Sequence, residues 1–352
     1  MKTLFILLPA LNHDSPIKGA IALANKLVDR NKIVVVVLKS VKKEEKEKLN
    51  KNIEVISLGK FIWPLKLIKY QRILQREKNK KISLSFCFSA DLINSFCGNI
   101  SNTFASLRGN IFINYKHSYG SMGFLLAKVH FYRLKKIRNI ISMTESMSAQ
   151  VKKETGLESI QIGNFIDEDK INPYRRHYSK SGPYNFVFTG SLSSRKRVDI
   201  LINAIHDLNK IGHEVECNII GDGNLKEYLI RLAKKLEIQN IVNFHGELED
   251  PFSLLSEADT FVLPSLSEGT SRSSMEALFL GVPCILRDID GNSELIQDGI
   301  NGALFQNEKD IAQAMIDWAN KSRTKKLYES ILLKNNFRQE HAIDLTIKTL
   351  DL

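Results

Sequence analysis

The sequence predicts an α/β protein with two doubly wound parallel-sheet domains. Hydrophobic runs of strand length alternate with helical stretches along the chain, and this alternation is the pattern of repeated βα units. The chain has 352 residues, of which 43% are hydrophobic, so it can bury two cores of ordinary size. A charged segment with two prolines, residues 171–183, interrupts the alternation and predicts a linker.

We therefore expect an N-terminal domain over residues 1–170 and a C-terminal domain over residues 184–335, with residues 336–352 forming a helix that returns to the N-terminal domain. The strands expected in the N-terminal domain are residues 4–8, 33–38, 53–58, 82–88, 111–115 and 140–144. Those expected in the C-terminal domain are residues 186–189, 215–220, 241–245, 260–263 and 284–287.

Two helices expected in the N-terminal domain, residues 64–76 and 123–138, carry both hydrophobic and basic side chains. One interpretation is a hydrophobic stripe that faces the core, with a solvated face opposite. The other is shallow docking on a membrane surface. No hydrophobic run reaches the roughly 18 to 20 residues that a membrane-spanning helix needs. Residues 1–10 are interpreted as a first strand and not as a signal peptide.

The net charge of +11 is unevenly distributed along the chain. Basic residues outnumber acidic residues 32 to 14 in residues 1–180, whereas acidic residues outnumber basic residues 25 to 18 in the rest. The basic half suits an anionic membrane leaflet or a diphosphate-bearing acceptor, or simply keeps the chain soluble. Nucleic acid is the other general explanation, but no nucleic-acid-binding motif accompanies the charge, so we expect no nucleic-acid partner.

The four cysteines, Cys87, Cys97, Cys217 and Cys284, lie far apart and match no zinc-ligand or disulfide spacing. We therefore expect reduced cysteines and a location in the cytosol.

Glu268 and Glu276 lie on either side of a hydroxyl-rich turn, in residues 267–276. The preceding strand, residues 260–263, ends just before this turn, and a helix is expected to begin near Thr270 or Ser271. Ligands of parallel sheets bind at the carboxyl ends of strands, and the N-terminus of a helix suits a phosphate. Carboxylates accept hydrogen bonds from sugar hydroxyls. The pattern therefore predicts a site for a polyol phosphate.

This segment resembles the E-x7-E motif of the retaining, GT-B-fold glycosyltransferases of family 4 (glycosyl transferases group 1). The resemblance is specific from about residue 184 to residue 306. It includes further segments in the family's order, namely residues 190–199 (phosphate binding), 221–223 (a G-x-G turn), 244–247 (base binding), 281–285 and 291–296. Residues 164–167 resemble the N-x-I-D end of the family's first domain. The resemblance implies two Rossmann-like domains facing across a cleft.

By this resemblance, Lys196 neutralises the diphosphate of the donor, and Glu268 binds hydroxyls of the transferred sugar. Glu276 would accept hydrogen bonds from the ribose hydroxyls. The remaining donor-binding residues implied are Gly269, Thr270, Ser271 and Arg272, whose turn would hold the distal phosphate, and Glu247 and Leu248, which would contact the nucleobase.

The chain departs from the family pattern at Ser191, where relatives often have an arginine. We expect Arg195, Arg197 or Arg272 to replace the missing cation.

In the N-terminal domain, Gly19 occupies the place of the family's glycine-rich loop, with Lys18 in place of a second glycine. His117, expected at the end of strand 111–115, resembles the histidine that many relatives place beside the transferred sugar. A structural role for this histidine is the alternative. Asp91 and Asn94 follow strand 82–88, and we consider both as acceptor contacts.

Two D-x-D strings, residues 167–169 and 288–290, raise the possibility of a metal site. The first lies next to the expected linker and the second at a strand end that is explained otherwise, so we attribute both to chance and expect no metal. A lysine, neighbouring arginines and a helix N-terminus already supply positive charge for a departing diphosphate.

The resemblance implies a retaining enzyme that moves a hexose or N-acetylhexosamine from a nucleotide diphosphate sugar, most simply a UDP-sugar, to a lipid-linked saccharide. Many relatives act in O-antigen, capsule or exopolysaccharide biosynthesis at the inner face of the cytoplasmic membrane, and we expect a peripheral location there. No cofactor is expected beyond the donor substrate. The alternatives are a nucleotide-sugar epimerase of the same fold and a catalytically idle partner subunit that recruits a transferase to the membrane.

Overall fold

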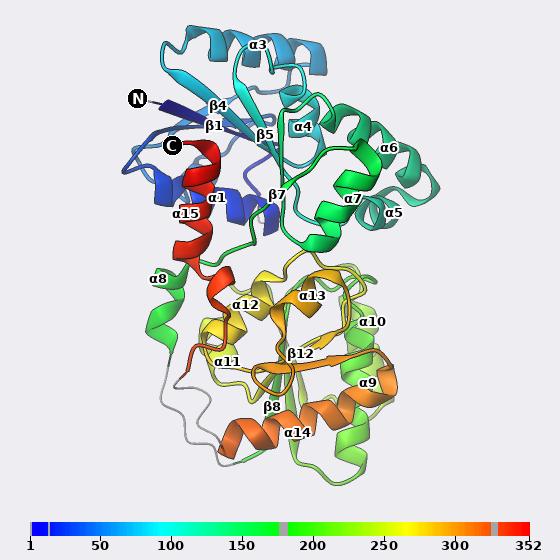
Figure 1. Ribbon diagram of the computed structural model, residues 1–352. Coiled ribbons are helices and arrows are strands. Elements are labelled where there is room, and N and C mark those ends of the chain that lie inside the picture. The colour runs from blue at the N-terminus through cyan, green and yellow to red at the C-terminus, as the bar shows by residue number, and fades with distance from the viewer. Residues whose placement is uncertain (1, 13–14, 176–181, 325–329) are drawn as a thin grey trace. The chain divides into compact units, whose positions relative to one another are not determined.

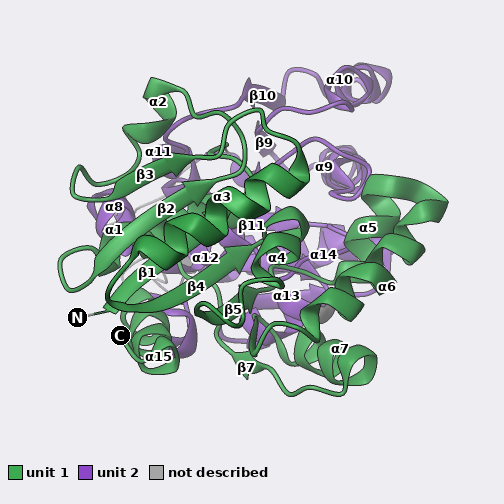
Figure 2. Cartoon of the chain, turned by 90° about the horizontal axis from the view of Figure 1, so that it is seen from above, with its two compact units in different colours: residues 1–165, 339–352 green, residues 166–338 purple. Residues whose placement is uncertain are grey.

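The computed structural model describes residues 2–12, 15–175, 182–324 and 330–352 (Figure 1). The chain forms two compact units, coloured separately in Figure 2. Unit 1 contains residues 1–165 and 339–352, and unit 2 contains residues 166–338. Of the expected linker, residues 171–183, positions 176–181 lie outside the described residues, and Asn172–Tyr174 form a 3₁₀ turn.

Unit 1 is built on a seven-stranded parallel sheet in the order β3-β2-β1-β4-β5-β6-β7. Its strands are β1 (Lys2–Leu8), β2 (Lys32–Val37), β3 (Glu54–Ser57), β4 (Lys80–Phe86), β5 (Asn102–Ser106), β6 (Asn139–Ser142) and β7 (Ile160–Gln161). Its helices are α1 (Ser15–Leu27), α2 (Lys43–Lys46), α3 (Trp63–Arg76), α4 (Phe88–Asn94), α5 (Ile111–Tyr119), α6 (Gly123–Leu134), α7 (Glu145–Thr155) and α15 (Gln339–Leu350).

Unit 2 is built on a six-stranded parallel sheet in the order β10-β9-β8-β11-β12-β13. Its strands are β8 (Tyr184–Thr189), β9 (Val215–Ile220), β10 (Val242–Gly246), β11 (Thr260–Leu263), β12 (Cys284–Arg287) and β13 (Gly302–Phe305). Its helices are α8 (Glu168–Ile171), α9 (Val198–Lys210), α10 (Lys226–Lys235), α11 (Phe252–Ser256), α12 (Arg272–Phe279), α13 (Asp290–Leu295) and α14 (Ile311–Thr324).

The strand orders confirm the predicted fold class. In both sheets the order reverses beside the first strand, at the β1/β4 boundary of unit 1 and the β8/β11 boundary of unit 2, as in doubly wound nucleotide-binding folds. Two such parallel-sheet domains in one chain make up a GT-B fold. Ligands of these sheets bind outside the carboxyl ends of the strands at the reversal point, so the fold indicates where to look in each unit.

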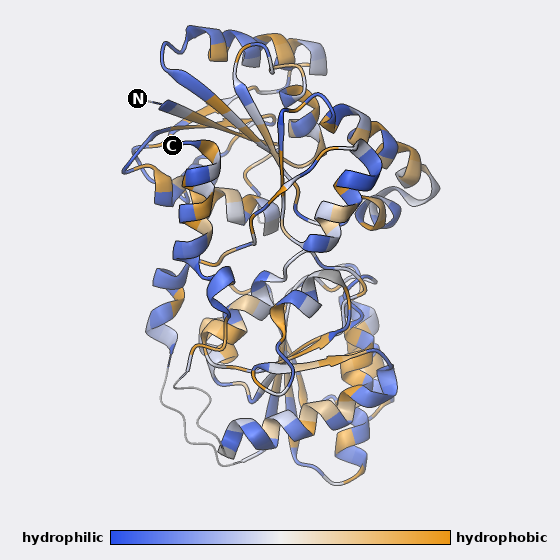
Figure 3. Cartoon of the chain, viewed as in Figure 1, coloured by the Kyte–Doolittle hydropathy of each residue, from blue (hydrophilic) through white to orange (hydrophobic). Residues whose placement is uncertain are grey.

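The central strands of unit 1 bury both of their faces. Phe5 and Leu7 of β1 join a core with α3 and α4, whereas Leu4, Ile6 and Leu8 join a second core with α1 and α15. This alternation follows from the two-residue period of a strand. Unit 2 forms a single large core, and Figure 3 shows hydrophobic residues along its central strands.

The strand predicted at residues 111–115 is wrong. Ile111–Tyr119 form helix α5, and Asn110 caps it by accepting a hydrogen bond from the backbone N–H of Ile113 at 3.2 Å. A short hydrophobic run does not distinguish a strand from a helix, and here the asparagine cap decides for the helix. The place in the sheet belongs instead to β5, and the short strands β7 and β13 were also not predicted. The other predicted strands are confirmed within a few residues of their expected ends.

Candidate functional site

The candidate site of unit 2 lies in the loops that follow β8 and β11. Residues 190–197 connect β8 to α9, and residues 264–271 connect β11 to α12. Both loops leave the carboxyl ends of the two strands at which the sheet order reverses, which is the expected ligand position. Two residues singled out in the sequence, Lys196 and Glu268, face each other from these loops.

Lys196 and Glu268 form a buried ion pair. The Nζ atom of Lys196 donates a hydrogen bond to Oε1 of Glu268 at 2.7 Å, and the side chains are only 9% and 11% exposed. Burial lowers the pKa of Lys196 below its usual value, although the Glu268 charge opposes this. Burial alone would raise the pKa of Glu268, but the charges of Lys196 and Arg195 outweigh it and hold that pKa below its ordinary range. Glu268 is therefore held as a carboxylate.

Arg195 is the second cation at this carboxylate. Its Nη1 atom donates to Oε1 of Glu268 at 2.9 Å and also to the backbone carbonyl of Ser267. The backbone of the same residue joins the two loops, because the N–H of Leu266 donates to the Arg195 carbonyl at 2.8 Å. Arg195 therefore ties the loop after β8 to the loop after β11.

The other two candidates for the missing cation, Arg197 and Arg272, lie next to other carboxylates. Arg197 donates hydrogen bonds to Asp199 from Nε at 3.1 Å and from Nη2 at 3.0 Å, and it also pairs with Glu308 at 3.2 Å, so its charge is directed to these carboxylates. Arg272 lies 4.0 Å from Glu276, one helical turn further along α12. Ser191 is exposed at the start of the first loop. Of the three arginines, Arg195 is thus the one in contact with the Lys196–Glu268 pair.

Helix α12 begins at the turn that the sequence indicated. Ser271 is its N-cap, and its side chain accepts a hydrogen bond from the backbone N–H of Ser274 at 3.3 Å. Thr270 and Ser271 are buried, Gly269 is partly exposed, and Glu276 lies in the second turn of the helix. The turn thus places the N-terminus of α12 shortly after Glu268 in the sequence.

Close backbone contacts fix this turn and the loops beside it. A Cβ atom on Gly291, at the start of α13, would lie 1.1 Å from the carbonyl oxygen of Gly269. Similarly, a Cβ atom on Gly221 would lie 1.9 Å from the carbonyl oxygen of Gly190, and one on Gly223 would lie 2.4 Å from that of Leu192. The glycines of the G-x-G turn are therefore needed for close packing against the loop after β8.

Glu247 and Leu248 follow β10 in an exposed loop. The N–H of Gly221 donates to the carbonyl of Gly246 at 2.7 Å, so this loop lies next to the G-x-G turn. These contacts connect the loops after β8, β9 and β10 into one edge of unit 2.

In unit 1, the residues indicated by the sequence lie on three different helices. Gly19 is buried in the second turn of α1, with Lys18 exposed beside it, so this segment is helical and not an open loop. His117 is exposed in the last turn of α5, and the expectation that it ends a strand is wrong.

Asp91 and Asn94 are not available to an acceptor, so their assignment as acceptor contacts is corrected. Both are almost fully buried in α4. Asp91 accepts a hydrogen bond from Ser85 at 2.6 Å and lies 2.9 Å from Nε2 of His130, and Asn94 donates to the carbonyl of Phe104 at 2.9 Å.

His130 also belongs to this buried network, and it was not among the residues predicted from the sequence. Its Nδ1 atom lies 2.9 Å from the hydroxyl of Tyr115, so a line of polar groups runs from Ser85 to Tyr115. His130 shares the buried side of α6 with Ala127, Phe131 and Leu134. A histidine at the helical spacing of an otherwise hydrophobic stripe is the signal that could have revealed it.

One residue of each D-x-D string is held by a contact other than a metal ion. Glu168 pairs with Arg338 at 2.7 Å, and Asp288 accepts a hydrogen bond from Gln306 at 2.9 Å. Within residues 2–12, 15–175, 182–324 and 330–352, no group of three or more His, Cys, Asp or Glu side chains is arranged to hold a metal ion.

One known family matches most of unit 2. The model of the family described as "Glycosyl transferases group 1" matches residues 171–332, which cover nearly all of this unit. Over residues 171–332, unit 2 is therefore similar to the glycosyl transferases group 1 family.

Individual relatives agree with this assignment. The chain is 29% identical over 258 residues to an uncharacterized glycosyltransferase, MJ1059, of Methanocaldococcus jannaschii, a match that covers 66% of this chain and 62% of the relative. It is 31% identical over 141 residues to the O-antigen biosynthesis glycosyltransferase WclY of Escherichia coli, covering 39% and 38% of the two chains. The matched regions thus span less than two thirds of either relative.

A solved structure matches the whole fold. The crystal structure of Anabaena Alr3699/HepE in complex with UDP has a TM-score of 0.81 at 19% identity and covers 100% of both chains. The complex of the same protein with UDP-glucose has a TM-score of 0.81 at 16% identity and covers 99% of both chains. At these identities the likeness concerns the fold.

Proposed function

We propose that this protein is a retaining glycosyltransferase that moves a sugar from a UDP-sugar to a lipid-linked saccharide. The observation that carries the proposal is the Lys196–Glu268 pair, which lies at the carboxyl ends of β8 and β11, beside the N-terminus of α12. The family match of unit 2 supports a nucleotide-sugar donor, and the UDP complexes of HepE favour uridine as the base.

In this proposal, different residues of unit 2 bind different parts of the donor. Lys196 and Arg195 face the diphosphate, together with backbone N–H groups at the start of α12. Glu268 accepts hydrogen bonds from the transferred sugar, and Glu276 accepts them from the ribose. Donor binding then requires Lys196 to share its charge between Glu268 and the incoming phosphate.

The proposed reaction exchanges one bond at the anomeric carbon for another. The bond between that carbon and the oxygen of the distal phosphate breaks, and a bond to the acceptor oxygen forms on the same face of the sugar. The acceptor proton passes to the departing phosphate oxygen. Lys196, Arg195 and the α12 backbone stabilise the charge that develops on the diphosphate, which is the principal contribution of preorganised donors to such a step. The proposed reaction uses no metal and no further cofactor.

For the acceptor, we propose that unit 1 docks on an anionic membrane. Large hydrophobic side chains are exposed on α6, and their spacing places them on one face of the helix. Helix α3 also carries exposed hydrophobic side chains, and hydrophobic and hydrophilic residues alternate along this helix (Figure 3). The exposed hydrophobic residues of this docking surface are Phe61, Ile62, Trp63, Leu65 and Ile68 near α3, Phe96 after α4, and Met122, Leu125, Val129 and Tyr132 near α6.

Phe96 connects the two parts of the docking surface. Its ring contacts that of Trp63 with centroids 5.6 Å apart, and the guanidinium of Arg133 lies 3.9 Å from its centroid. Basic residues accompany the hydrophobic ones, which is the composition that binds anionic lipid surfaces. In the part of the chain that is described, no helix is long and hydrophobic enough to cross a membrane. We therefore propose a peripheral location at the inner face of the cytoplasmic membrane.

The role in O-antigen, capsule or exopolysaccharide biosynthesis is part of the same proposal, and the similarity to WclY supports its O-antigen part.

The donor is tested by measuring hydrolysis and transfer of radiolabelled UDP-sugars by wild type, Glu268→Gln and Lys196→Ala, with lipid-linked saccharide supplied in vesicles and with EDTA in a parallel series. We expect transfer by wild type that EDTA does not change, and a loss of at least 100-fold in both variants. Lys235→Ala, in the exposed last turn of α10, is the matched control and should retain full activity. A changed sugar on free UDP would indicate an epimerase, and full activity of both site variants would overturn the proposal.

Membrane docking is tested by sedimentation with phosphatidylglycerol vesicles. Leu125→Glu and Tyr132→Glu replace exposed side chains and should reduce vesicle binding without changing UDP binding. Ile211→Glu is the matched control, because Ile211 is equally exposed but belongs to unit 2. Equal binding by all three variants would contradict the docking surface.

A further inference from the structure

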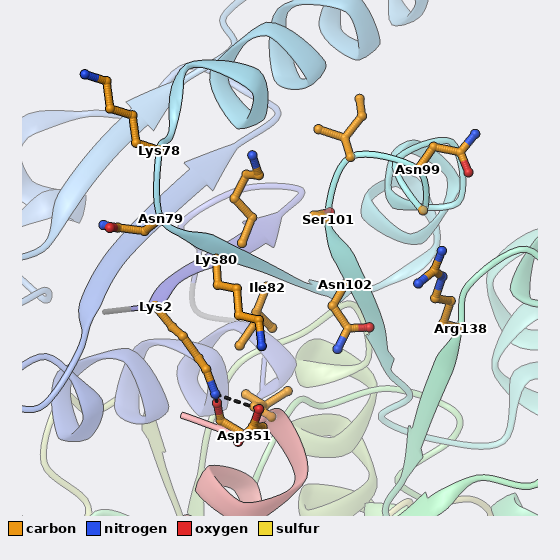
Figure 4. Close-up of a pocket in the computed structure, with 14 residues that line it drawn as sticks. Lys2, Lys78, Asn79, Lys80, Ile82, Asn99, Ser101, Asn102, Arg138 and Asp351 are labelled. Carbon is orange, nitrogen blue, oxygen red and sulfur yellow. Dashed lines mark hydrogen bonds and ion pairs between the residues drawn. The ribbon is translucent and has the colours of Figure 1, made fainter.

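A pocket with a strong charge bias lies in unit 1, at the edge of the sheet where β1, β4 and β5 begin (Figure 4). It has a volume of about 500 Å³. Because the strands are parallel, this amino-terminal edge is opposite to the carboxyl ends at which doubly wound sheets bind their usual ligands. The pocket therefore does not belong to the expected substrate position of this sheet.

Basic side chains dominate the pocket lining. Lys2, Lys78, Lys80, Lys81 and Arg138 line it, whereas the acidic side chain in the lining is Asp351. Lys2 is paired with Asp351 at 2.7 Å, and Lys81 donates to the backbone carbonyl of Glu77 at 3.2 Å. Lys78, Lys80 and Arg138 form no ion pair with any described carboxylate. The pocket thus holds more positive charge than its own residues neutralise.

Polar groups lie among these cations. Asn102 begins β5 on one side of the pocket, and its Oδ1 atom accepts a hydrogen bond from Asn139 at 3.1 Å. This contact leaves the amide nitrogen of Asn102 for a ligand. In Figure 4 the side chains of Lys80 and Asn102 extend toward the Lys2–Asp351 pair. The Lys80 charge also contributes to the lowered pKa of Asp351, although the hydrogen bond from Lys2 is the larger cause. A second anion placed there would meet Lys2, Lys80 and Asn102 together.

We propose that this pocket binds a diphosphate group. A diphosphate carries two to three negative charges, which match the cations that the pocket leaves unpaired, and its oxygens accept hydrogen bonds from lysine, arginine and amide donors. The volume lies within the roughly 300 to 1,000 Å³ typical of small-molecule sites, so there is room for the group that the diphosphate carries. The ligand is either a free nucleotide or metabolite diphosphate, or the diphosphate headgroup of a lipid. This inference does not depend on the proposed transfer reaction.

The test is equilibrium dialysis of the full-length protein with radiolabelled pyrophosphate at low ionic strength. Pyrophosphate also fits the proposed donor site, so the Lys196→Ala protein is used to remove that binding. We expect wild type to bind two pyrophosphates and Lys196→Ala to keep one. In the Lys196→Ala protein, adding Lys80→Ala and Arg138→Ala should weaken the remaining site at least tenfold.

A matched control separates this site from general charge attraction. Lys234→Ala and Lys235→Ala together remove two exposed charges from α10 and should leave pyrophosphate binding unchanged. Equal loss in the two double variants, or no binding by Lys196→Ala, would overturn the inference. Hydrolysis of the UDP-sugar by Lys80→Ala/Arg138→Ala should stay within twofold of wild type, because it reports on the donor site alone, so failure at this pocket is distinguishable from failure of the donor site. Displacement of pyrophosphate by vesicles that contain a lipid diphosphate would assign the lipid source, and displacement by free nucleoside diphosphate alone would assign the soluble source.

Discussion

The Nζ atom of Lys196 lies 2.7 Å from Oε1 of Glu268, and the two residues are brought together from loops that follow different strands. Both side chains are buried, so each charge depends on the other for compensation. The same two residues are the ones assigned to the diphosphate and to the sugar. Stability and donor binding are therefore expected to be linked at this pair.

Replacing Lys196 with alanine should destabilise unit 2 by roughly 3 kcal/mol, the lower end of the range for breaking a buried ion pair, because Arg195 still faces Glu268. The chain has two tryptophans, Trp63 in unit 1 and Trp318 in unit 2. A Trp63→Phe background leaves Trp318 to report on unit 2 by fluorescence during urea unfolding. Lys235→Ala in the same background should lie within about 0.5 kcal/mol of the parent. An unchanged midpoint for Lys196→Ala would contradict the importance of the pair.

The stabilising effect of Glu268 should disappear in acid. The pKa of this carboxyl is lowered in the folded protein, so its contribution is complete above the unfolded value of about 4.3 and is lost as the pH falls through the folded value. The difference in unfolding free energy between wild type and Glu268→Gln should be constant from pH 6 to 7.5 and should shrink below about pH 4.3. Urea unfolding across this range, followed by Trp318, measures it. A difference in unfolding free energy that grows as the pH falls would contradict the lowered pKa of Glu268.

A second buried ion pair holds the start of β8 to α14. Asp259 is fully buried, accepts hydrogen bonds from Arg323 at 3.1 and 2.8 Å, and also accepts one from the backbone N–H of Asn185 at 2.8 Å. Asp259→Ala should cost about 3–5 kcal/mol because it leaves the arginine unpaired. Asp259→Asn keeps some of the hydrogen bonds and should cost less. Calorimetric melting of both variants tests this order, and equal melting temperatures would refute it.

Gly291→Ala should disrupt the turn at residues 268–270. The added Cβ atom would overlap the carbonyl oxygen of Gly269, and a backbone atom cannot move without shifting the turn beside Glu268. We expect UDP affinity to fall at least tenfold, measured by isothermal titration calorimetry. Lys235→Ala is the control, because this exposed side chain on α10 belongs to neither proposed site. Wild-type affinity in Gly291→Ala would show that the turn can adapt.

Alkylation of the native protein should modify Cys87 first. The other three cysteines are buried, and burial raises the pKa of Cys97 to about 12 and those of Cys217 and Cys284 above their usual range. Because the thiolate is the reactive form, these three should react only after unfolding. Peptide mass spectrometry after brief iodoacetamide treatment at pH 8, with and without urea, checks the prediction. Early modification of Cys217 or Cys284 would contradict the burial described for unit 2.

The sequence was sufficient to predict the second unit largely as observed. Strands at residues 215–220, 260–263 and 284–287 have the predicted ends, and α12 begins beside the predicted Ser271. These elements combine hydrophobic runs with clear boundaries, so local pattern and tertiary structure agree.

The first unit was less predictable for physical reasons. Strand β5 contains the polar residues Asn102, Thr103 and Ser106, so it lacks the pattern of a buried strand. Its neighbours in the sheet and the hydrogen bond from Asn94 to the Phe104 carbonyl stabilise it. Such tertiary contacts are invisible to a window of local sequence.

Local sequence patterns also could not predict which charged residues pair with one another. Arg195 and Glu268 are 73 positions apart, and nothing near Arg195 distinguishes it from Arg197. Only the folded loops show which guanidinium reaches the carboxylate. Likewise, Asp91 follows a predicted strand end, as a binding residue would. The structure shows instead that its carboxylate is buried in contact with His130 and Ser85.

The packing of α15 has a consequence for how the chain is made. Ala342 and Leu350 belong to the core of unit 1, although all of unit 2 precedes them in the sequence. Unit 2 is contiguous in the sequence, so it can fold as soon as Arg338 has left the ribosome. Unit 1 cannot be completed until α15 has been synthesised, and until then one face of its sheet is incompletely covered. During synthesis the second half of the protein can mature before the first, and the nascent N-terminal half is the part that would engage chaperones.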